Sequence, residues 1–237
     1  ARIAREAADE AQEIAAKVGL QRKVWVAGSI GPTSKSLSLS PDVADPAFRP
    51  YSFEQMKEAY RLQAEALLKG GADLLLIETC FDALNVKAAL AGIQEIVRER
   101  QLTTLAPSQL SWAPPRSRGW QNASSVIQPL PDILPVMISV SVGDRSGRTL
   151  TGQTLEAFYT SVCHYPILTF GLNCSLGAAE LMPLVEEIDK WCRCGISCYP
   201  NAGLPNEMGG YDQSPEDMAA QIKAVASKGL VNIVGGC

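Results

Sequence analysis

Two cysteines stand at the ends of apolar runs that read as β-strands. Cys174 follows the run 166–173, and Cys237 follows the run 231–236. Glu78 and Asn173 occupy the same kind of position, Glu78 at the end of the run 72–78 and Asn173 beside Cys174. The carboxyl ends of strands in parallel α/β folds carry the functional site, so an acid, an amide and two thiols are expected on one face. Two such thiolates suit zinc, which binds cysteine sulfur at about 2.3 Å but takes four ligands.

A nucleophilic cysteine is the alternative use of these thiols. It needs a nearby base, and the only histidine, His164, precedes its strand and is therefore expected on the opposite face. The remaining cysteines are interpreted as small buried or surface thiols: Cys80, Cys163, Cys192, Cys194 and Cys198. An odd number of cysteines, seven, without a signal peptide indicates a reduced, cytoplasmic setting rather than a secreted disulfide scaffold.

The elements that must position these residues alternate between strand and helix. Six apolar runs of strand length occur, at 23–28, 72–78, 135–142, 166–173, 195–200 and 231–236. Their continuous apolar character is typical of parallel strands covered on both faces. Amphipathic helical patterns separate them, one capped by Ser52 and another by Ser214 followed by Pro215. The pattern predicts an α/β fold, a (β/α)₈ TIM barrel with about six of its eight strands present.

A doubly wound sheet is the second possibility for this pattern. It usually carries a glycine-rich phosphate loop after its first strand, and here only Gly28 and Gly31 stand there. The whole chain, 1–237, is interpreted as one partial barrel with an atypical insertion at about 103–134. That segment is rich in serine and proline and has almost no periodicity. It is expected to be a dispensable excursion on the face opposite Glu78.

Charge and hydropathy exclude other classes. The net charge is −4, so there is no basic surface for nucleic acid. No apolar run approaches the roughly 20 residues that cross a bilayer, so no membrane partner is expected.

Several long motifs resemble the homocysteine-binding domain of cobalamin-dependent methionine synthase. They are "GLNCSLGAAEL", "YPNAGLPNEMGGYD", "VNIVGGC", "AGSIGPTSKSLSLSPDVADPAFRPYSFEQMKEAY", "GGADLLLIETCFDALNVKAAL" and "SGRTLTGQTLEAFY". The resemblance covers nearly the whole chain except about 103–134. It implies a zinc-dependent homocysteine S-methyltransferase on a (β/α)₈ barrel, a methyltransferase of the methionine synthase type.

The resemblance also implies roles for individual residues. Zinc in this family is held by three cysteines, here Cys174, Cys237 and a residue that would follow Cys237. Glu78 would bind the ammonium group of L-homocysteine, and Asn173 would shape the substrate pocket. The homocysteine thiolate would take the methyl group of methylcobalamin, giving methionine. Methylcobalamin would be bound by another domain, and the partners would be the folate- and cobalamin-binding domains of a longer protein.

Because the family's first two strands and third cysteine are not found, the chain is expected to be a truncated fragment that is inactive alone. Two alternatives remain open. One is a non-catalytic remnant, and the other is a homocysteine methyltransferase that uses another methyl donor, such as betaine or S-methylmethionine.

Overall fold

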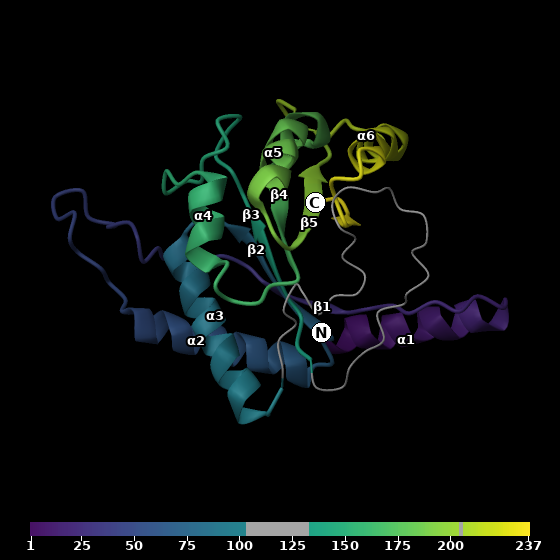
Figure 1. Ribbon diagram of the computed structural model, residues 1–237, viewed down its shortest axis with the longest axis horizontal. Coiled ribbons are helices and arrows are strands. Elements are labelled where there is room, and N and C mark those ends of the chain that lie inside the picture. The colour runs from purple at the N-terminus through teal and green to yellow at the C-terminus, as the bar shows by residue number, and fades with distance from the viewer. Residues whose placement is uncertain (103–132, 204–205) are drawn as a thin grey trace.

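The protein forms one open, parallel β-sheet covered by helices (Figure 1). The computed structural model describes residues 1–102, 133–203 and 206–237. The strands are β1 (Ala27–Ile30), β2 (Leu74–Cys80), β3 (Val136–Val140), β4 (Thr169–Gly177), β5 (Gly195–Asn201) and β6 (Ile233–Val234). The helices are α1 (Arg2–Lys17), α2 (Phe53–Lys69), α3 (Ala83–Glu99), α4 (Leu155–Val162), α5 (Ala178–Trp191) and α6 (Pro215–Ser227).

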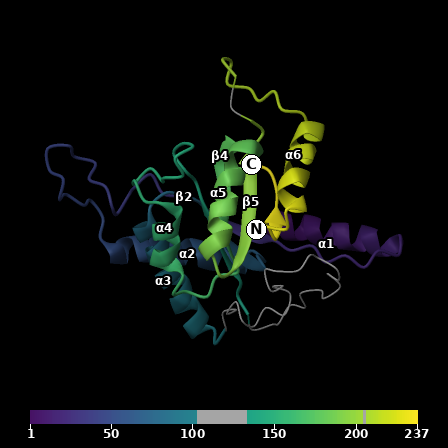
Figure 2. The same cartoon turned by 45° about the horizontal axis from the view of Figure 1, so that its top comes forward.

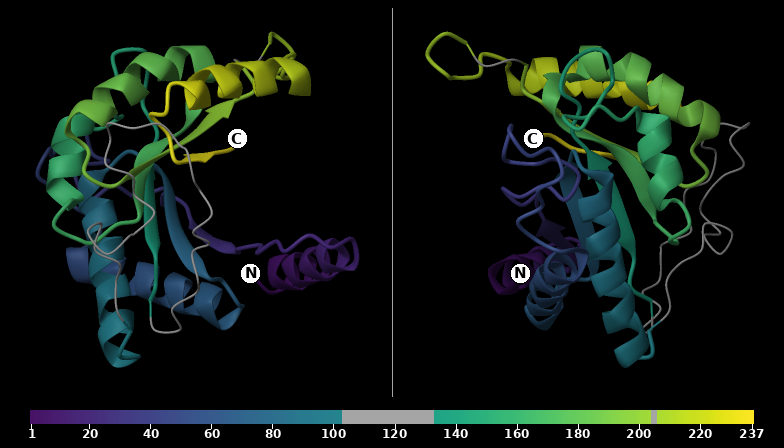
Figure 3. Two further views of the ribbon diagram at one scale, coloured as in Figure 1. Left: turned by 45° about the vertical axis from the view of Figure 1, so that its right-hand side comes forward. Right: turned by 90° about the vertical axis from the view of Figure 1, so that its left-hand side faces the viewer.

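The strand order follows the chain from β1 to β6, and every neighbouring pair is parallel. A doubly wound sheet reverses its strand order at a switch point, so the observed order excludes that alternative. Figure 3 shows the helices wrapping the outside of the curved sheet. The six described strands do not close on themselves, which confirms the prediction of an incomplete (β/α)₈ barrel.

The two faces of the sheet carry different side chains. Outward positions are large and apolar and pack under the helices, as Phe170, Leu172 and Ile138 do with no exposed surface. Inward positions are mixed, since Ser139 and Gly171 are small or polar whereas Met137 and Leu76 belong to a second apolar cluster. The inner face, which is the barrel lumen in a (β/α)₈ fold, is therefore only partly apolar.

The helix boundaries follow the predicted capping signals. The Ser52 hydroxyl accepts a hydrogen bond from the Gln55 N–H, and the Gln55 side chain accepts one from the Ser52 N–H, which completes a capping box. Ser214 caps α6 and Pro215 takes its first position. Beyond the end of α6, Gly229 has φ +68°, as a helix-terminating glycine commonly does.

The first strand begins later than its apolar run predicts. The backbone N–H of Val24 donates to the Gln12 side chain, and that of Val26 donates to Asp73. These contacts replace ladder bonds, so β1 covers Ala27–Ile30 rather than 23–28. The last strand is also shorter than its run. The predicted insertion at about 103–134 falls outside the described residues, apart from Ile133 and Leu134, and Leu134 is buried in the core.

The long segment after β1 is fastened to the start of α3 by Asp82. The Asp82 carboxylate accepts hydrogen bonds from the Ser36 hydroxyl at 2.5 Å, the Ser38 hydroxyl at 2.6 Å and the Ser38 N–H at 3.0 Å. It also caps α3 through the Leu84 N–H at 2.9 Å. Burial acts to raise the pKa of this carboxyl, but the hydrogen bonds outweigh burial and hold the pKa below its ordinary value.

We expect this carboxylate to make folding stability depend on acid. A depressed folded-state pKa contributes stability that is complete above the unfolded pKa, about 3.9 for aspartate, and is lost as pH falls through the folded value. Asp82→Asn should lower the free energy of unfolding at pH 7 by about 1–3 kcal/mol and flatten its fall below about pH 4. Urea unfolding at several pH values measures both effects. An unchanged acid dependence would contradict this assignment, and Asp212→Asn, at an exposed aspartate, is the control.

Candidate active site at the carboxyl ends of the strands

The structure brings Cys174 and Cys237 together. Their Cα atoms are 5.7 Å apart and their sulfur atoms are joined as a disulfide. Cys174 lies in the last part of β4, and the C-terminus lies beside β4 and β5 (Figures 1 and 2). The two thiols thus meet at the carboxyl end of the sheet, as the positions of their runs predict.

Gly235, two residues before Cys237, makes this approach possible. The Gly235 N–H donates to the Cys198 carbonyl at 3.1 Å, and the Cys237 N–H donates to the Pro200 carbonyl at 2.9 Å, so the tail runs along β5. A Cβ on Gly235 would come within 2.6 Å of the Tyr199 ring. The glycine is therefore required for the tail to reach Cys174 past that ring.

Asn173 links the Cys174 sulfur to the end of β2. Its side-chain oxygen accepts from the Thr79 N–H at 2.9 Å. Its side-chain nitrogen donates to the Thr79 hydroxyl at 3.0 Å and to the Cys174 sulfur at 2.9 Å. Asn173 is 3% exposed, so these contacts lie away from bulk solvent.

The backbone around this amide is strained. Thr79, Cys174 and Ser175 have φ values of 58°, 57° and 64°, a left-handed conformation that non-glycine residues rarely adopt. For a β-branched residue such as Thr79 it is an outlier. Among the described residues one other non-glycine residue shares it, Gln101 after α3. Strained residues cluster where a structure holds side chains in functional positions.

Glu78 lies on the inner face of β2, one residue before Thr79. Ser29 of β1 donates a short hydrogen bond to its carboxylate. A further short hydrogen bond joins the hydroxyls of Ser141 and Ser175. Sequence reasoning misses Ser29, Thr79, Ser141 and Ser175. A usable signal for Ser29 is its inward position, in register with Leu76 and therefore two residues from Glu78 across the strand pair.

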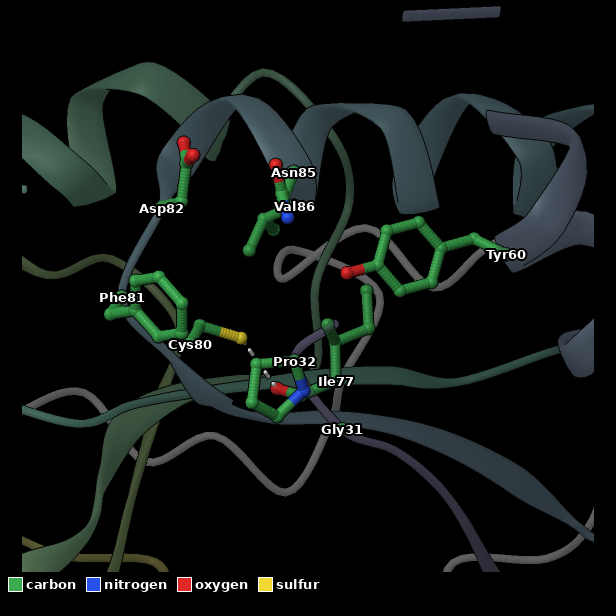
Figure 4. A pocket seen from close by; sticks show the side chains of 9 residues that line it. All are labelled: Gly31, Pro32, Tyr60, Ile77, Cys80, Phe81, Asp82, Asn85 and Val86. Carbon is green, nitrogen blue, oxygen red and sulfur yellow. Dashed lines mark hydrogen bonds between the residues drawn. The ribbon is translucent and has the colours of Figure 1, made fainter. Parts of the chain in front are cut away.

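A small cavity near this edge belongs to the core rather than to the site. It is about 10 Å³, room for roughly one water molecule. Figure 4 shows Tyr60, Ile77, Cys80 and Asn85 around it, between the sheet and α3. Burial raises the pKa of the Cys80 thiol above its ordinary value, which disfavours the thiolate form of Cys80.

The other cysteines and the histidine lie where the sequence predicts. Cys80, Cys192, Cys194 and Cys198 are buried and Cys163 is exposed. His164 is exposed in the turn before β4, at the amino end of the sheet. In the described part of the chain no group of three or more histidine, cysteine, aspartate or glutamate side chains could hold a metal ion. The same residues include no helix long and apolar enough to span a membrane.

A parallel sheet wound in chain order, with two cysteines and a carboxylate at its carboxyl edge, is the arrangement of a (β/α)₈-type barrel, in which that edge carries the functional site. The chain belongs to the homocysteine S-methyltransferase family, whose model matches residues 1–237. It is a methyltransferase family, in agreement with the resemblance stated above.

Solved structures agree on the fold. The apo form of the homocysteine methyltransferase MmuM from Escherichia coli superposes with a TM-score of 0.62 at 19% identity, covering 98% of this chain and 65% of that one. The metallated form gives 0.62 at 20% identity, covering 98% and 63%. The oxidized form gives 0.62 at 18% identity, again covering 98% and 63%. The chain thus spans somewhat less than two thirds of the length of these proteins.

Proposed function

We propose that the chain is the homocysteine-binding domain of a zinc-dependent methyltransferase of the methionine synthase type. The observation that carries the proposal is the meeting of Cys174 and Cys237 at the carboxyl ends of their strands, with Glu78 on the inner face of the same sheet. The family match supports homocysteine as the substrate. MmuM, a homocysteine methyltransferase, has a metallated and an oxidized form, and in this chain a cysteine pair that can be oxidised to a disulfide would offer two metal ligands when reduced.

The two cysteines fit a zinc ion. Zinc held at about 2.3 Å from each sulfur in a tetrahedral site separates the sulfurs by roughly 3.8 Å. Cα atoms 5.7 Å apart allow that separation once the disulfide is reduced, because small side-chain rotations suffice. When bound, the metal would supply an electrophile that keeps a substrate thiol deprotonated at neutral pH.

The chain's own residues would select and orient homocysteine. The Glu78 carboxylate, held by Ser29, would pair with the substrate ammonium group. The substrate backbone would lie on the inner face of the sheet, between Glu78 and the two cysteines. Asn173 would shape that space. The substrate thiol would then point toward Cys174 and Cys237, where its methylation gives methionine.

The methyl donor is proposed to be methylcobalamin, bound by a separate cobalamin-binding domain, with a folate-binding domain as a further partner. The motif resemblance to cobalamin-dependent methionine synthase supports this donor over betaine or S-methylmethionine. A product assay with each of the three donors, supplied with the chain, zinc and homocysteine, separates them. Methionine formed from betaine or S-methylmethionine but not from methylcobalamin would overturn the donor assignment.

The substrate proposal is tested by Glu78→Gln, with Co²⁺ as a spectroscopic substitute for zinc. Homocysteine should change the thiolate-to-cobalt absorption of the wild-type chain. Loss of a charge-assisted pair costs about 1.5–3 kcal/mol, so Glu78→Gln should raise the homocysteine dissociation constant roughly 10- to 100-fold. Glu187→Gln, an exposed glutamate on α5, is the matched control. The proposal would be overturned if homocysteine did not change the wild-type spectrum. Equal homocysteine dissociation constants in the two variants would also overturn it.

A further inference from the structure

The Asn173 amide is fully engaged by the protein. Its nitrogen carries two N–H groups, and these point to the Thr79 hydroxyl and the Cys174 sulfur. Its oxygen receives the Thr79 N–H. With 3% of its surface exposed, Asn173 has no donor left for a ligand. We infer that Asn173 is a positioning residue, which locks the Glu78–Thr79 end of β2 to the sulfur of Cys174.

The hydrogen bonds of the Asn173 side chain reach across the sheet. β3 lies between β2 and β4 in the strand order, yet Asn173 on β4 reaches Thr79 on β2, 94 residues away in sequence. β3 ends at Val140, paired with Leu172 on one side and Cys80 on the other. Thr79 lies in the register shift just before the Cys80–Val140 pair, so the side chain reaches across the end of β3 and joins two strands that are not neighbours.

The same hydrogen bonds also hold residues of strained backbone on both β2 and β4. Left-handed conformations of non-glycine residues are energetically unfavourable, and such residues persist where the surroundings hold them. Asn173 holds Thr79 by two hydrogen bonds, and it holds the side chain of Cys174, whose own φ is 57°. Without the amide, Thr79 and Cys174 are free to relax toward ordinary backbone conformations. The Cys174 sulfur would then leave the position facing Cys237.

This inference deepens the proposed function and rests on it for its consequence. A substrate that pairs with Glu78 at one end and presents a thiol to Cys174 at the other needs a constant distance between the two. Asn173 supplies that constancy, because the residue next to Glu78 and the Cys174 sulfur are held by one planar amide. The positioning itself concerns the protein alone, so it is measurable without substrate.

The test measures how readily Cys174 and Cys237 pair. In glutathione buffers, the protein dithiol plus glutathione disulfide gives the protein disulfide plus two molecules of reduced glutathione. Alkylation followed by peptide mass analysis reports the oxidised fraction of this pair. Asn173→Ala should lower the equilibrium constant for forming the Cys174–Cys237 disulfide about tenfold. A hydrogen bond between neutral groups is worth roughly 1–1.5 kcal/mol. Cobalt affinity should fall about 10- to 100-fold, as is typical when a group supporting a metal ligand is lost.

Asn85→Ala is the matched control. Asn85 is also a buried asparagine whose oxygen accepts a backbone N–H, that of Leu37, and whose nitrogen donates to a carbonyl, that of Lys35. Its loss should destabilise the fold comparably while leaving the pairing constant within about twofold of wild type. Equal shifts in the two variants, or no shift in Asn173→Ala, would overturn the positioning role.

A second variant keeps the test decisive if Asn173→Ala folds poorly. Adding Thr79→Gly removes the strain at this position, since glycine adopts positive φ without cost. The double variant should fold and recover part of the pairing constant, and an absence of recovery would overturn the link through Thr79. If wild type shows no thiolate-to-cobalt absorption while the glutathione results follow expectation, the zinc proposal fails and the positioning role stands.

Discussion

Replacing Gly171 by alanine is expected to unfold the protein. Gly171 lies on the inner face of β4, paired with Ser139 on β3 and Ser197 on β5. A Cβ there would overlap the carbonyl oxygen and hydroxyl of Ser197 and lie 2.6 Å from its carbonyl carbon. The obstacle is backbone in the next strand, so relief requires separating two central strands. Overpacking of this kind should cost about 4 kcal/mol or more, a large part of a typical domain's stability.

Urea unfolding followed by circular dichroism measures this loss. The matched control is Gly31→Ala, because a Cβ on Gly31 meets nothing within 4 Å and its φ is not positive. It should change the free energy of unfolding by less than about 0.5 kcal/mol or stabilise slightly. A Gly171→Ala protein as stable as wild type would contradict the close approach of β4 and β5.

Cys174→Ala is expected to weaken metal binding about 100-fold. Reduction of the Cys174–Cys237 disulfide gives two thiolate ligands, and the described residues hold no group of three or more candidate ligands, so the wild-type chain should bind zinc weakly and lose it to a mild chelator. In structural zinc sites each of four ligands accounts for roughly 3 kcal/mol, so removing one thiolate should weaken binding about 100-fold. Titration of the reduced protein with Co²⁺, read from the thiolate-to-cobalt absorption, measures the change.

Cys163→Ala is the control for that titration, because Cys163 is exposed at the end of α4 and away from the thiol pair. It should bind cobalt as wild type does. Stoichiometric zinc retained by wild type through dialysis against a chelator would contradict the weak site. Unchanged cobalt affinity in Cys174→Ala would contradict the assignment of Cys174 as a ligand.

Much of the fold is predictable from local signals. The capping box at Ser52 and the Ser214–Pro215 start of α6 are short-range patterns, and the structure has both where the sequence places them. The order of strand and helix predicts a parallel sheet because a parallel connection needs a crossover helix. Strand ends are less predictable, since β1 begins late where Val24 and Val26 bond to side chains that the chain brings from elsewhere.

The shared position of the candidate site residues is also predictable from sequence, because parallel strands place their carboxyl ends at one edge. That rule puts Glu78, Asn173, Cys174 and Cys237 on the same side before any coordinates are known. It does not say which of them touch. The rule also does not identify residues whose type alone suggests no particular chemistry, such as Ser29 and Thr79.

The tertiary structure decided the contacts that join distant strands. The bonds of Asn173 to Thr79 span 94 residues, and the same amide contacts the sulfur of Cys174, which like Thr79 has left-handed backbone. The need for glycine at Gly171 and Gly235 likewise arises from Ser197 and Tyr199 of β5. Local sequence sets which conformations a segment prefers, whereas register and close approach depend on which strands pack together. For that reason the sequence predicts both cysteines at one edge of the sheet. The role of the Asn173 amide in orienting Cys174 can be inferred only from the folded chain.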